Sequence, residues 1–207
     1  IGDSSVYYGQ DPKITEKVWK DNFSNTFLQD GKLQIMVDSN TFLVNTGKEL
    51  ILIDAGSGDT LGPTMGQTVK NIILSGYKPE NINKILITHA HPDHVNGLTV
   101  DGKMIYPNAT VYLSKADYDF WIKVTPDLKK ILEPYMKKNQ CIFFKDGDKI
   151  TDGVKIISLP GHSVGHTGYE VTSNNEKLLF WGDIIHDADV QFSNMNVETV
   201  MGKYDEE

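Results

Sequence analysis

The sequence predicts an α+β fold in which two packed β-sheets are covered by helices. Short β-prone runs come in groups separated by turn residues, and segments with helical spacing lie between the groups. This order favours packed sheets with helical covers over a strictly alternating βαβ fold. The chain has 207 residues, 39% of them hydrophobic and 23% charged, which is enough to bury one substantial core. We therefore expect a single domain over residues 1–207.

The first predicted elements are three short strands, at residues 33–38, 41–45 and 49–54. Ser39-Asn40 separates the first two, and Thr46-Gly47-Lys48 separates the second and third. Both spacers are typical of turns. We therefore expect these strands to form an antiparallel meander.

A helix is expected next, over residues 64–75, because Met65, Val69 and Ile72 recur at helical spacing. Gly76 follows and is expected to end this helix as its cap. The later predicted elements are strands at 84–88 and 110–114, helices at 115–123 and 125–138 with a break at Pro126, and strands at 154–159, 168–172 and 177–181.

The charge balance disfavours anionic partners. Twenty-eight acidic residues against twenty basic ones give a formal net charge of −8, which opposes the counterion release that drives nucleic-acid binding. All twenty basic residues are Lys, so no guanidinium can grip a phosphate monoester bidentately. No stretch approaches the roughly 20 apolar residues of a membrane helix. We expect neither a nucleic-acid nor a membrane partner.

Cys141 is the single cysteine, which excludes an internal disulfide and a cysteine-rich metal cage. We expect it to be a small buried side chain without a role. The chain starts at Ile1 rather than at Met, so removal of an upstream segment, a signal peptide included, stays open. Localisation is therefore unknown between the cytoplasm and the periplasm or exterior.

Three histidines and an aspartate lie within six consecutive residues, His89-Ala90-His91-Pro92-Asp93-His94. Imidazole and carboxylate are ligands that suit zinc and related first-row ions. A loop leaving a strand can point His89 and His91 at one centre while Asp93 and His94 turn toward a second. Pro92 stiffens this turn by fixing its own φ.

Thr88 and Asp54 are candidates for residues that orient the metal ligands through hydrogen bonds. An aspartate before glycine suits a turn equally well. The remaining histidines of the chain are His162, His166 and His186.

The segment HAHPDH has the H-x-H-x-D-H form of the metallo-β-lactamase superfamily, which the chain resembles over nearly its whole length. Residues 159–167, LPGHSVGHT, resemble the family's histidine loop, whose first histidine is a metal ligand. This likeness implies that His162 is a ligand and that His166 supports the loop. Phe180-Trp181-Gly182-Asp183 resembles the strand end that carries the bridging carboxylate, which makes Asp183 the bridge.

The resemblance implies an αββα four-layer sandwich that holds two divalent metal ions, expected to be zinc. His89, His91 and His162 would bind one ion, and Asp93 and His94 the other. Asp183 would bind both.

Three further segments resemble the branch that contains methyl parathion hydrolase and the quorum-quenching N-acyl homoserine lactone lactonases: Gly62 to Gly66, Gly76 to Glu80, and Trp181 to His186. The resemblance implies a hydrolase in which a hydroxide bridging the two metals cleaves an ester-like bond. A lactone or ester is the expected substrate. The alternatives are a phosphotriester hydrolase, a mono-iron sulfur dioxygenase and a β-lactamase.

Two residues receive catalytic roles. Asp93, beside the second metal, is the expected proton carrier. His186 stands three residues after the bridging aspartate, where lactonases of this superfamily often have a tyrosine, and an imidazole can donate a hydrogen bond to a substrate oxygen.

Rival functions fit the sequence less well. Flavin-coupled di-iron members carry an acidic residue at the position of His91, and the nearly intact ligand set argues against a non-catalytic binding module. The acidic charge argues against an RNA-processing nuclease. We expect a small-molecule substrate, and a homodimer stays open.

The chain departs from the family pattern after the bridging aspartate. The family completes its second metal site with a histidine well beyond that position, yet only His186 follows Asp183 here. We therefore expect the C-terminal part of the domain to be incomplete. The second site should then bind its metal more weakly than the first.

Overall fold

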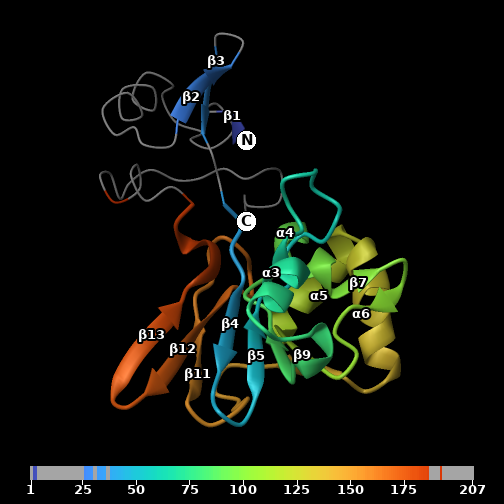
Figure 1. Ribbon diagram of the computed structural model, residues 1–207, viewed down its shortest axis with the longest axis vertical. Helices are drawn as coiled ribbons and strands as arrows, with labels where there is room; N and C mark the ends of the chain where they lie inside the picture. Colours follow the sequence, from blue (N-terminus) through green and yellow to red (C-terminus); the bar gives the residue numbers. More distant parts are fainter. Residues whose placement is uncertain (1, 4–25, 30–31, 36–37, 187–191, 193–207) are drawn as a thin grey trace. The chain divides into compact units, whose positions relative to one another are not determined.

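The computed structural model describes residues 2–3, 26–29, 32–35, 38–186 and 192 (Figure 1). The chain divides into two compact units, residues 1–38 with 183–207, and residues 39–182. In the first unit an antiparallel sheet has the order β1-β3-β2, from β1 (Gly2–Asp3), β2 (Thr26–Gln29) and β3 (Lys32–Ile35). The expectation of a single domain stays a prediction.

The larger unit is built on a five-stranded sheet of order β10-β9-β6-β5-β4. Its strands are β4 (Phe42–Asn45), β5 (Leu50–Ile53), β6 (Lys84–Leu86), β9 (Thr110–Ser114) and β10 (Cys141–Phe144). β5, β6, β9 and β10 run parallel, and β4 is antiparallel to β5. The carboxyl ends of four strands therefore meet at one edge of this sheet.

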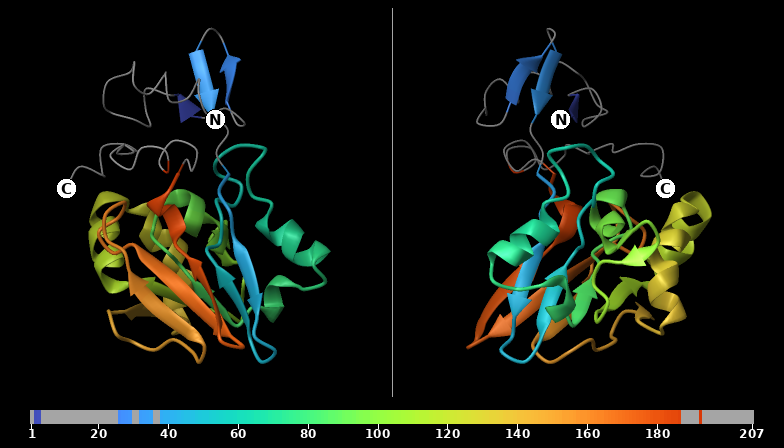
Figure 2. Two further views of the ribbon diagram at one scale, coloured as in Figure 1. Left: turned by 90° about the vertical axis from the view of Figure 1, so that its left-hand side faces the viewer. Right: turned by 45° about the vertical axis from the view of Figure 1, so that its right-hand side comes forward.

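A second sheet of the same unit is antiparallel, with the order β11-β12-β13. It contains β11 (Val154–Ser158), β12 (Thr167–Ser173) and β13 (Glu176–Phe180). Figure 2 shows this sheet as a layer beside the five-stranded sheet.

Helices form the next layer. They are α3 (Thr68–Leu74), α4 (Pro92–Val95), α5 (Lys115–Val124) and α6 (Asp127–Lys137). Short 3-10 turns cover Pro79–Asn81, Asn96–Leu98 and Gly182–Ile184, and a small hairpin joins β7 (Thr99–Val100) to β8 (Lys103–Met104). Among the described residues, no helix is both long and apolar enough to cross a membrane.

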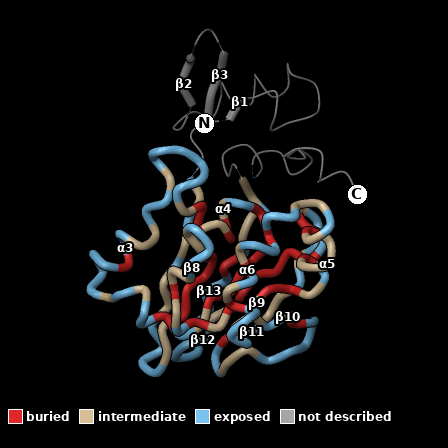
Figure 3. Tube along the Cα trace, turned by 90° about the vertical axis from the view of Figure 1, so that its right-hand side faces the viewer, coloured by how far each residue is buried: buried red, intermediate tan, exposed pale blue. Residues whose placement is uncertain are grey.

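Alternating side chains of the parallel strands fill two separate cores. Leu52 of β5 and Ile85 of β6 pack with apolar residues of α3, α5 and α6. Ile53 and Leu86, their neighbours, point the opposite way and pack with the second sheet, for example with Tyr169. This alternation is the period-two pattern of a strand buried on both faces. Figure 3 shows the resulting buried interior.

The arrangement agrees with the αββα sandwich. Residues 39–182 supply a helical layer and both sheets, and no helix of the described residues forms the second outer layer. The incompleteness of the C-terminal part stays a prediction.

The structure corrects three details of the expected elements. β3 pairs with β1 and β2 instead of joining a meander with β4, because strand patterns do not specify the partner strand. The larger sheet is mostly parallel, and β10, which was not predicted, extends it. α3 begins at Thr68, later than expected, but Gly76 follows its end with a φ of +85°, as a left-handed cap requires.

Candidate metal centre

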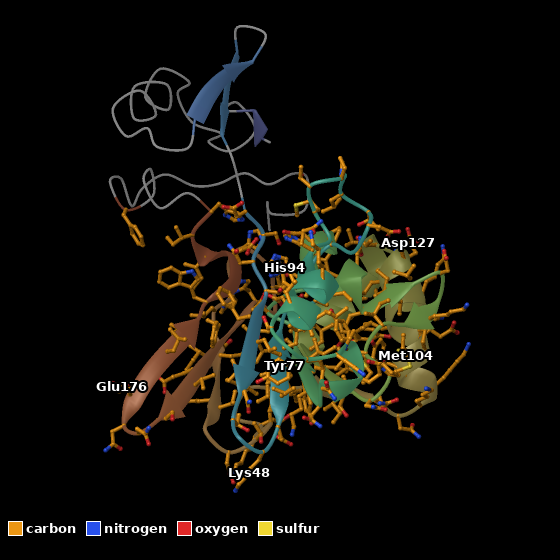
Figure 4. The ribbon with its side chains drawn as sticks, viewed as in Figure 1. Lys48, Tyr77, His94, Met104, Asp127 and Glu176 are labelled. Carbon is orange, nitrogen blue, oxygen red and sulfur yellow. The ribbon has the colours of Figure 1, made fainter. Side chains whose placement is uncertain are left out.

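The histidine cluster lies where β5 and β6 end. Asp54 follows β5 and its main-chain N–H donates to the carbonyl of Leu86, the last residue of β6, at 3.0 Å. Because these strands are parallel, Asp54 and the segment that begins at Thr88 meet at one sheet edge. Figure 4 shows His94 at this end of the strands and Lys48 at the opposite end. Crevices at the carboxyl ends of parallel strands are common binding sites.

The first histidine loop, residues 89–94, runs into the short helix α4. Pro92 is the first residue of α4, and His91 caps it in an extended conformation, which is what a residue before proline favours. The carbonyl of His94 accepts a hydrogen bond from the N–H of Ala55 at 2.8 Å. A Cβ on Gly97 would overlap the carbonyl oxygen of Ala55, so only glycine permits this close packing.

The second histidine loop joins β11 to β12 and carries His162. The N–H of Thr167 donates to the carbonyl of Thr88 at 2.9 Å. The hydroxyl of Tyr169 donates to the carbonyl of Ile87 at 2.6 Å. These bonds attach the second sheet to the segment that leads into the cluster, and they bring His162 to His89 and His91.

Three ring nitrogens converge at the centre. Nδ1 of His91 lies 2.9 Å from Nε2 of His89 and 2.9 Å from Nε2 of His162, while the two Nε2 atoms are 3.1 Å apart. A tetrahedral zinc ion with Zn–N bonds of about 2.0–2.1 Å spaces its nitrogens about 3.3 Å apart. Three imidazole nitrogens this close together favour a cation between them. The three side chains therefore fit a metal ion.

Asp93 and His94 form a second pair of candidate ligands beside this triangle. Nε2 of His94 lies 3.3 Å from Oδ2 of Asp93. Nδ1 of His94 lies 2.9 Å from Oδ2 of Asp54, whose carboxylate also accepts the N–H of Thr88 at 2.7 Å and its hydroxyl at 2.9 Å. Asp54 and Thr88 thus make the supporting contacts that were expected of them.

Asp183 and His186 belong to the smaller unit, where Nε2 of His186 lies 3.3 Å from Oδ2 of Asp183. Gly182, the residue before Asp183, belongs to the larger unit. Its Cα lies so near His166 that a Cβ would come within 2.6 Å of Nε2 of that ring. His166 is buried, and its main-chain N–H and carbonyl bond to the carbonyl of Ser163 and to the N–H of Leu159. His166 therefore belongs to the framework of the second loop.

Sequence reasoning missed a buried carboxylate that is hydrogen-bonded to neighbours of the candidate ligands. Asp117, in the first turn of α5, is 0% exposed and accepts a hydrogen bond from the hydroxyl of Ser163. Nε1 of Trp121 donates to the same Ser163 oxygen at 2.7 Å. Burial raises the pKa of the Asp117 carboxyl above its usual range, while hydrogen bonds from Ser163 and the main chain act in the opposite direction. The position of Asp117 after a strand that ends at the same sheet edge was the available signal.

An apolar cavity of about 500 Å³ reaches Gly97, three residues after His94. Ala55 and Gly97, whose main chains pack together, line it, with Met65, Val69 and Ile105. This volume is within the range of small-molecule sites, roughly 300–1,000 Å³.

Comparison with known proteins gives one consistent family. The family described as the metallo-beta-lactamase superfamily matches residues 36–193. A crystal structure of the hydrolase AbOPH, assigned to the beta lactamase superfamily, is 32% identical with a TM-score of 0.86, covering 97% of this chain and 72% of that one. AidC, a dizinc quorum-quenching lactonase in complex with a product, is 26% identical with a TM-score of 0.79, covering 92% and 70%.

Curated relatives match a shorter region. A hydroxyacylglutathione hydrolase of Yersinia pestis is 28% identical over 149 residues, which are 70% of this chain and 46% of that protein. A beta-lactamase-like protein 2 homolog of Drosophila melanogaster is 30% identical over 151 residues, 71% of this chain and 47% of that protein. The chain thus spans about half the length of the curated relatives it matches.

Proposed function

The chain belongs to the metallo-β-lactamase superfamily, and from this premise we propose that it is a binuclear metal-dependent hydrolase of lactones or related esters. The observation that carries the proposal is the convergence of the His89, His91 and His162 ring nitrogens, 2.9 to 3.1 Å apart. Side chains of this kind at this spacing suit a zinc ion.

In this proposal His89, His91 and His162 would hold one ion, and Asp93 and His94 would hold the other. Asp183 would contribute to both. It follows Gly182 directly, and consecutive Cα atoms lie only about 3.8 Å apart, so the packing of Gly182 against His166 and Thr88 supports this role. Divalent ions bound here would supply an activated water and polarise the electrophilic oxygen of the substrate.

Side chains of the protein orient a ligand, carry a proton and bind the substrate oxygen in this proposal. Asp54 accepts a hydrogen bond from Nδ1 of His94, which turns Nε2 of that ring toward Asp93. Asp93, whose side chain is 28% exposed, can carry a proton between solvent and the leaving oxygen. His186 would donate a hydrogen bond to the substrate oxygen, as an imidazole can in its neutral or its charged form, and its Nε2 lies 3.3 Å from Oδ2 of Asp183.

The substrate class is supported by the relatives and by the cavity. AidC is a lactonase, and the curated relatives include hydroxyacylglutathione hydrolases. The apolar cavity lined by Ala55 and Gly97 has the volume for an acyl-bearing small molecule. The absence of arginine and the net charge of −8 argue for a neutral substrate over a phosphate monoester.

The test is a hydrolysis screen of the zinc-loaded, full-length protein over lactones, aryl esters, a glutathione thioester, phosphotriesters and β-lactams. We expect the highest kcat/KM on a lactone or ester, and we expect chelation to remove it. His162→Ala should remove the same activity, whereas Asp146→Asn, an exposed substitution, should retain it. A preference for phosphotriesters would overturn the substrate class, and turnover that survives chelation would overturn the proposed reaction.

A further inference from the structure

Burying the carboxylate of Asp117 costs free energy of folding. Its side chain is 0% exposed, and taking a carboxylate out of water is unfavourable unless hydrogen bonds compensate. The donors near its oxygens are neutral groups: the main-chain N–H of Ala90, the hydroxyl of Ser163, the main-chain N–H of Gly165 and the indole N–H of Trp121. An apolar side chain would pack two loops at lower cost, so the carboxylate calls for another reason.

The two oxygens of Asp117 hold different loops. Oδ2 accepts the N–H of Ala90 at 2.6 Å, and Ala90 stands between His89 and His91. Oδ1 accepts the hydroxyl of Ser163 and, at 3.1 Å, the N–H of Gly165. Ser163 directly follows His162. One rigid carboxylate therefore connects the loop of the first two candidate ligands to the loop of the third.

The second loop is shaped to reach this carboxylate. A Cβ on Gly165 would overlap the main-chain nitrogen of Asp117 and lie 2.7 Å from Oγ of Ser114. Only glycine allows so close an approach to the start of α5. The N-terminal end of a helix also favours a negative charge, and Asp117 lies in the first turn of α5.

Trp121 completes the contact one helical turn later. Its Nε1 donates to Oγ of Ser163 at 2.7 Å, and its ring meets that of His91 edge to face with centroids 4.7 Å apart. Residues four apart on a helix share one face. Asp117 and Trp121 thus present one face of α5 to both histidine loops.

We propose that Asp117 is a positioning residue that fixes the distance between the His89–His91 loop and the His162 loop before a metal ion binds. The inference rests on the proposed metal centre, because only a shared metal ion requires the three ring nitrogens to converge. Asp117 itself touches neither the ion nor the substrate. Its effect is transmitted through Ala90, Ser163 and Gly165.

Asp117→Asn replaces one of the two acceptor oxygens by an NH2 group and leaves the volume of the side chain nearly unchanged. An amide group has one acceptor and one NH2 donor, so either orientation sets the NH2 against a main-chain N–H, that of Ala90 or that of Gly165. The two loops can no longer be held together by one side chain. We expect zinc affinity at the three-histidine site to fall about 10- to 100-fold, as when other outer partners of metal ligands are lost.

The matched control is Asp119→Asn. Asp119 lies on the same helix, but its side chain is 50% exposed and pairs with Lys115, so zinc affinity should stay unchanged. Ser163→Ala is a milder variant that removes one donor only, and its affinity should fall less than that of Asp117→Asn. If Asp117→Asn does not fold, the comparison of Ser163→Ala with Asp119→Asn decides, and equal affinities would overturn the proposal.

Two readouts separate positioning from general stability. In the metal-free protein, the amide proton of Ala90 should resonate far downfield because of its short bond to a carboxylate, and it should lose this shift in Asp117→Asn. With cobalt in place of zinc, the visible absorption spectrum of the variant should change at saturating metal, because the ligand geometry differs. A lower melting temperature alone moves neither signal.

The outcomes distinguish the two proposals. A folded Asp117→Asn protein with unchanged zinc affinity and cobalt spectrum would overturn the role of Asp117 and leave the metal centre intact. A wild-type protein that binds no metal would overturn the metal centre itself, whatever the Ala90 amide proton shows.

Discussion

Oδ2 of Asp54 lies 2.9 Å from Nδ1 of His94, although forty positions separate the two residues in the sequence. Both side chains are nearly buried, at 5% and 4% exposed. A carboxylate at this distance selects the ring tautomer with hydrogen on Nδ1, which directs the lone pair of Nε2 toward Asp93. Asp54 therefore determines how His94 can serve as a ligand.

Asp54→Asn should weaken the metal site that uses His94. Asp54 has a φ of +58°, a left-handed conformation that asparagine also adopts readily, so the backbone should be conserved. If the amide oxygen keeps the bond from the N–H of Thr88, the NH2 group faces Nδ1 of His94 and favours the ring tautomer with hydrogen on Nε2, which cannot bind a metal. We expect about a 10- to 100-fold loss of affinity for the second equivalent of zinc. A competitive zinc titration measures it, and a titration identical to that of Asp146→Asn would refute this role.

Gly97→Ala should destabilise the fold and disturb the first histidine loop. The new Cβ would overlap the carbonyl oxygen of Ala55, whose N–H bonds to His94. Overpacking of this kind costs about 1–3 kcal/mol, measurable as a lower free energy of unfolding in denaturant. Gly47→Ala is the control: its φ is +80° with nothing near the added carbon, so it should affect stability but leave zinc affinity unchanged. Equal zinc affinities for both variants would contradict the coupling.

Glu49 should contribute stability that is lost in acid. Its side chain forms an ion pair with Lys84 and accepts the hydroxyl of Thr151 at 2.9 Å, and the hydrogen bond from Lys84 holds the pKa of Glu49 below its ordinary value of 4.5. A lowered pKa in the folded state stabilises the protein above the unfolded-state pKa, and this contribution disappears as pH falls through the folded-state pKa.

The corresponding experiment compares Glu49→Gln with wild type by thermal unfolding. Glu49→Gln should be less stable near pH 7, by no more than about 1 kcal/mol, and the difference should vanish once the pH falls below the folded-state pKa of Glu49. Glu176→Gln, at the exposed first residue of β13, should show no such dependence. A difference that stays constant over the pH range would rule out the ion pair as its cause.

Cys141 should react slowly with thiol reagents while the protein is folded. Burial raises the pKa of its thiol to about 12, so almost no reactive thiolate exists near neutral pH. Alkylation should become fast once denaturant unfolds the chain, as followed by mass spectrometry. Rapid alkylation under native conditions would show that the thiol is accessible and ionised.

The sequence predicted individual strands better than it predicted their pairing. Turn residues and strand patterns located β4, β5, β9 and the antiparallel second sheet, because these depend on local alternation. They could not show that β5, β6, β9 and β10 are parallel, since the partner strand is chosen by tertiary packing.

The same limit applies around the candidate metal centre. The spacing of His89, His91, Asp93 and His94 indicates metal ligands directly. Asp117 gave only an indirect signal, its position after a strand, because an aspartate in the first turn of a helix is ordinary. Its burial between two distant loops exists only in the folded chain.

The most direct test of the metal-dependent hydrolase is a zinc titration of metal-depleted protein during lactone hydrolysis. We predict activity near the baseline without metal, a rise that tracks bound zinc, and neither tight binding nor turnover for His91→Ala. Asp183→Asn should likewise lose activity. Full turnover by exhaustively chelated wild-type protein, or by His91→Ala, would contradict the account.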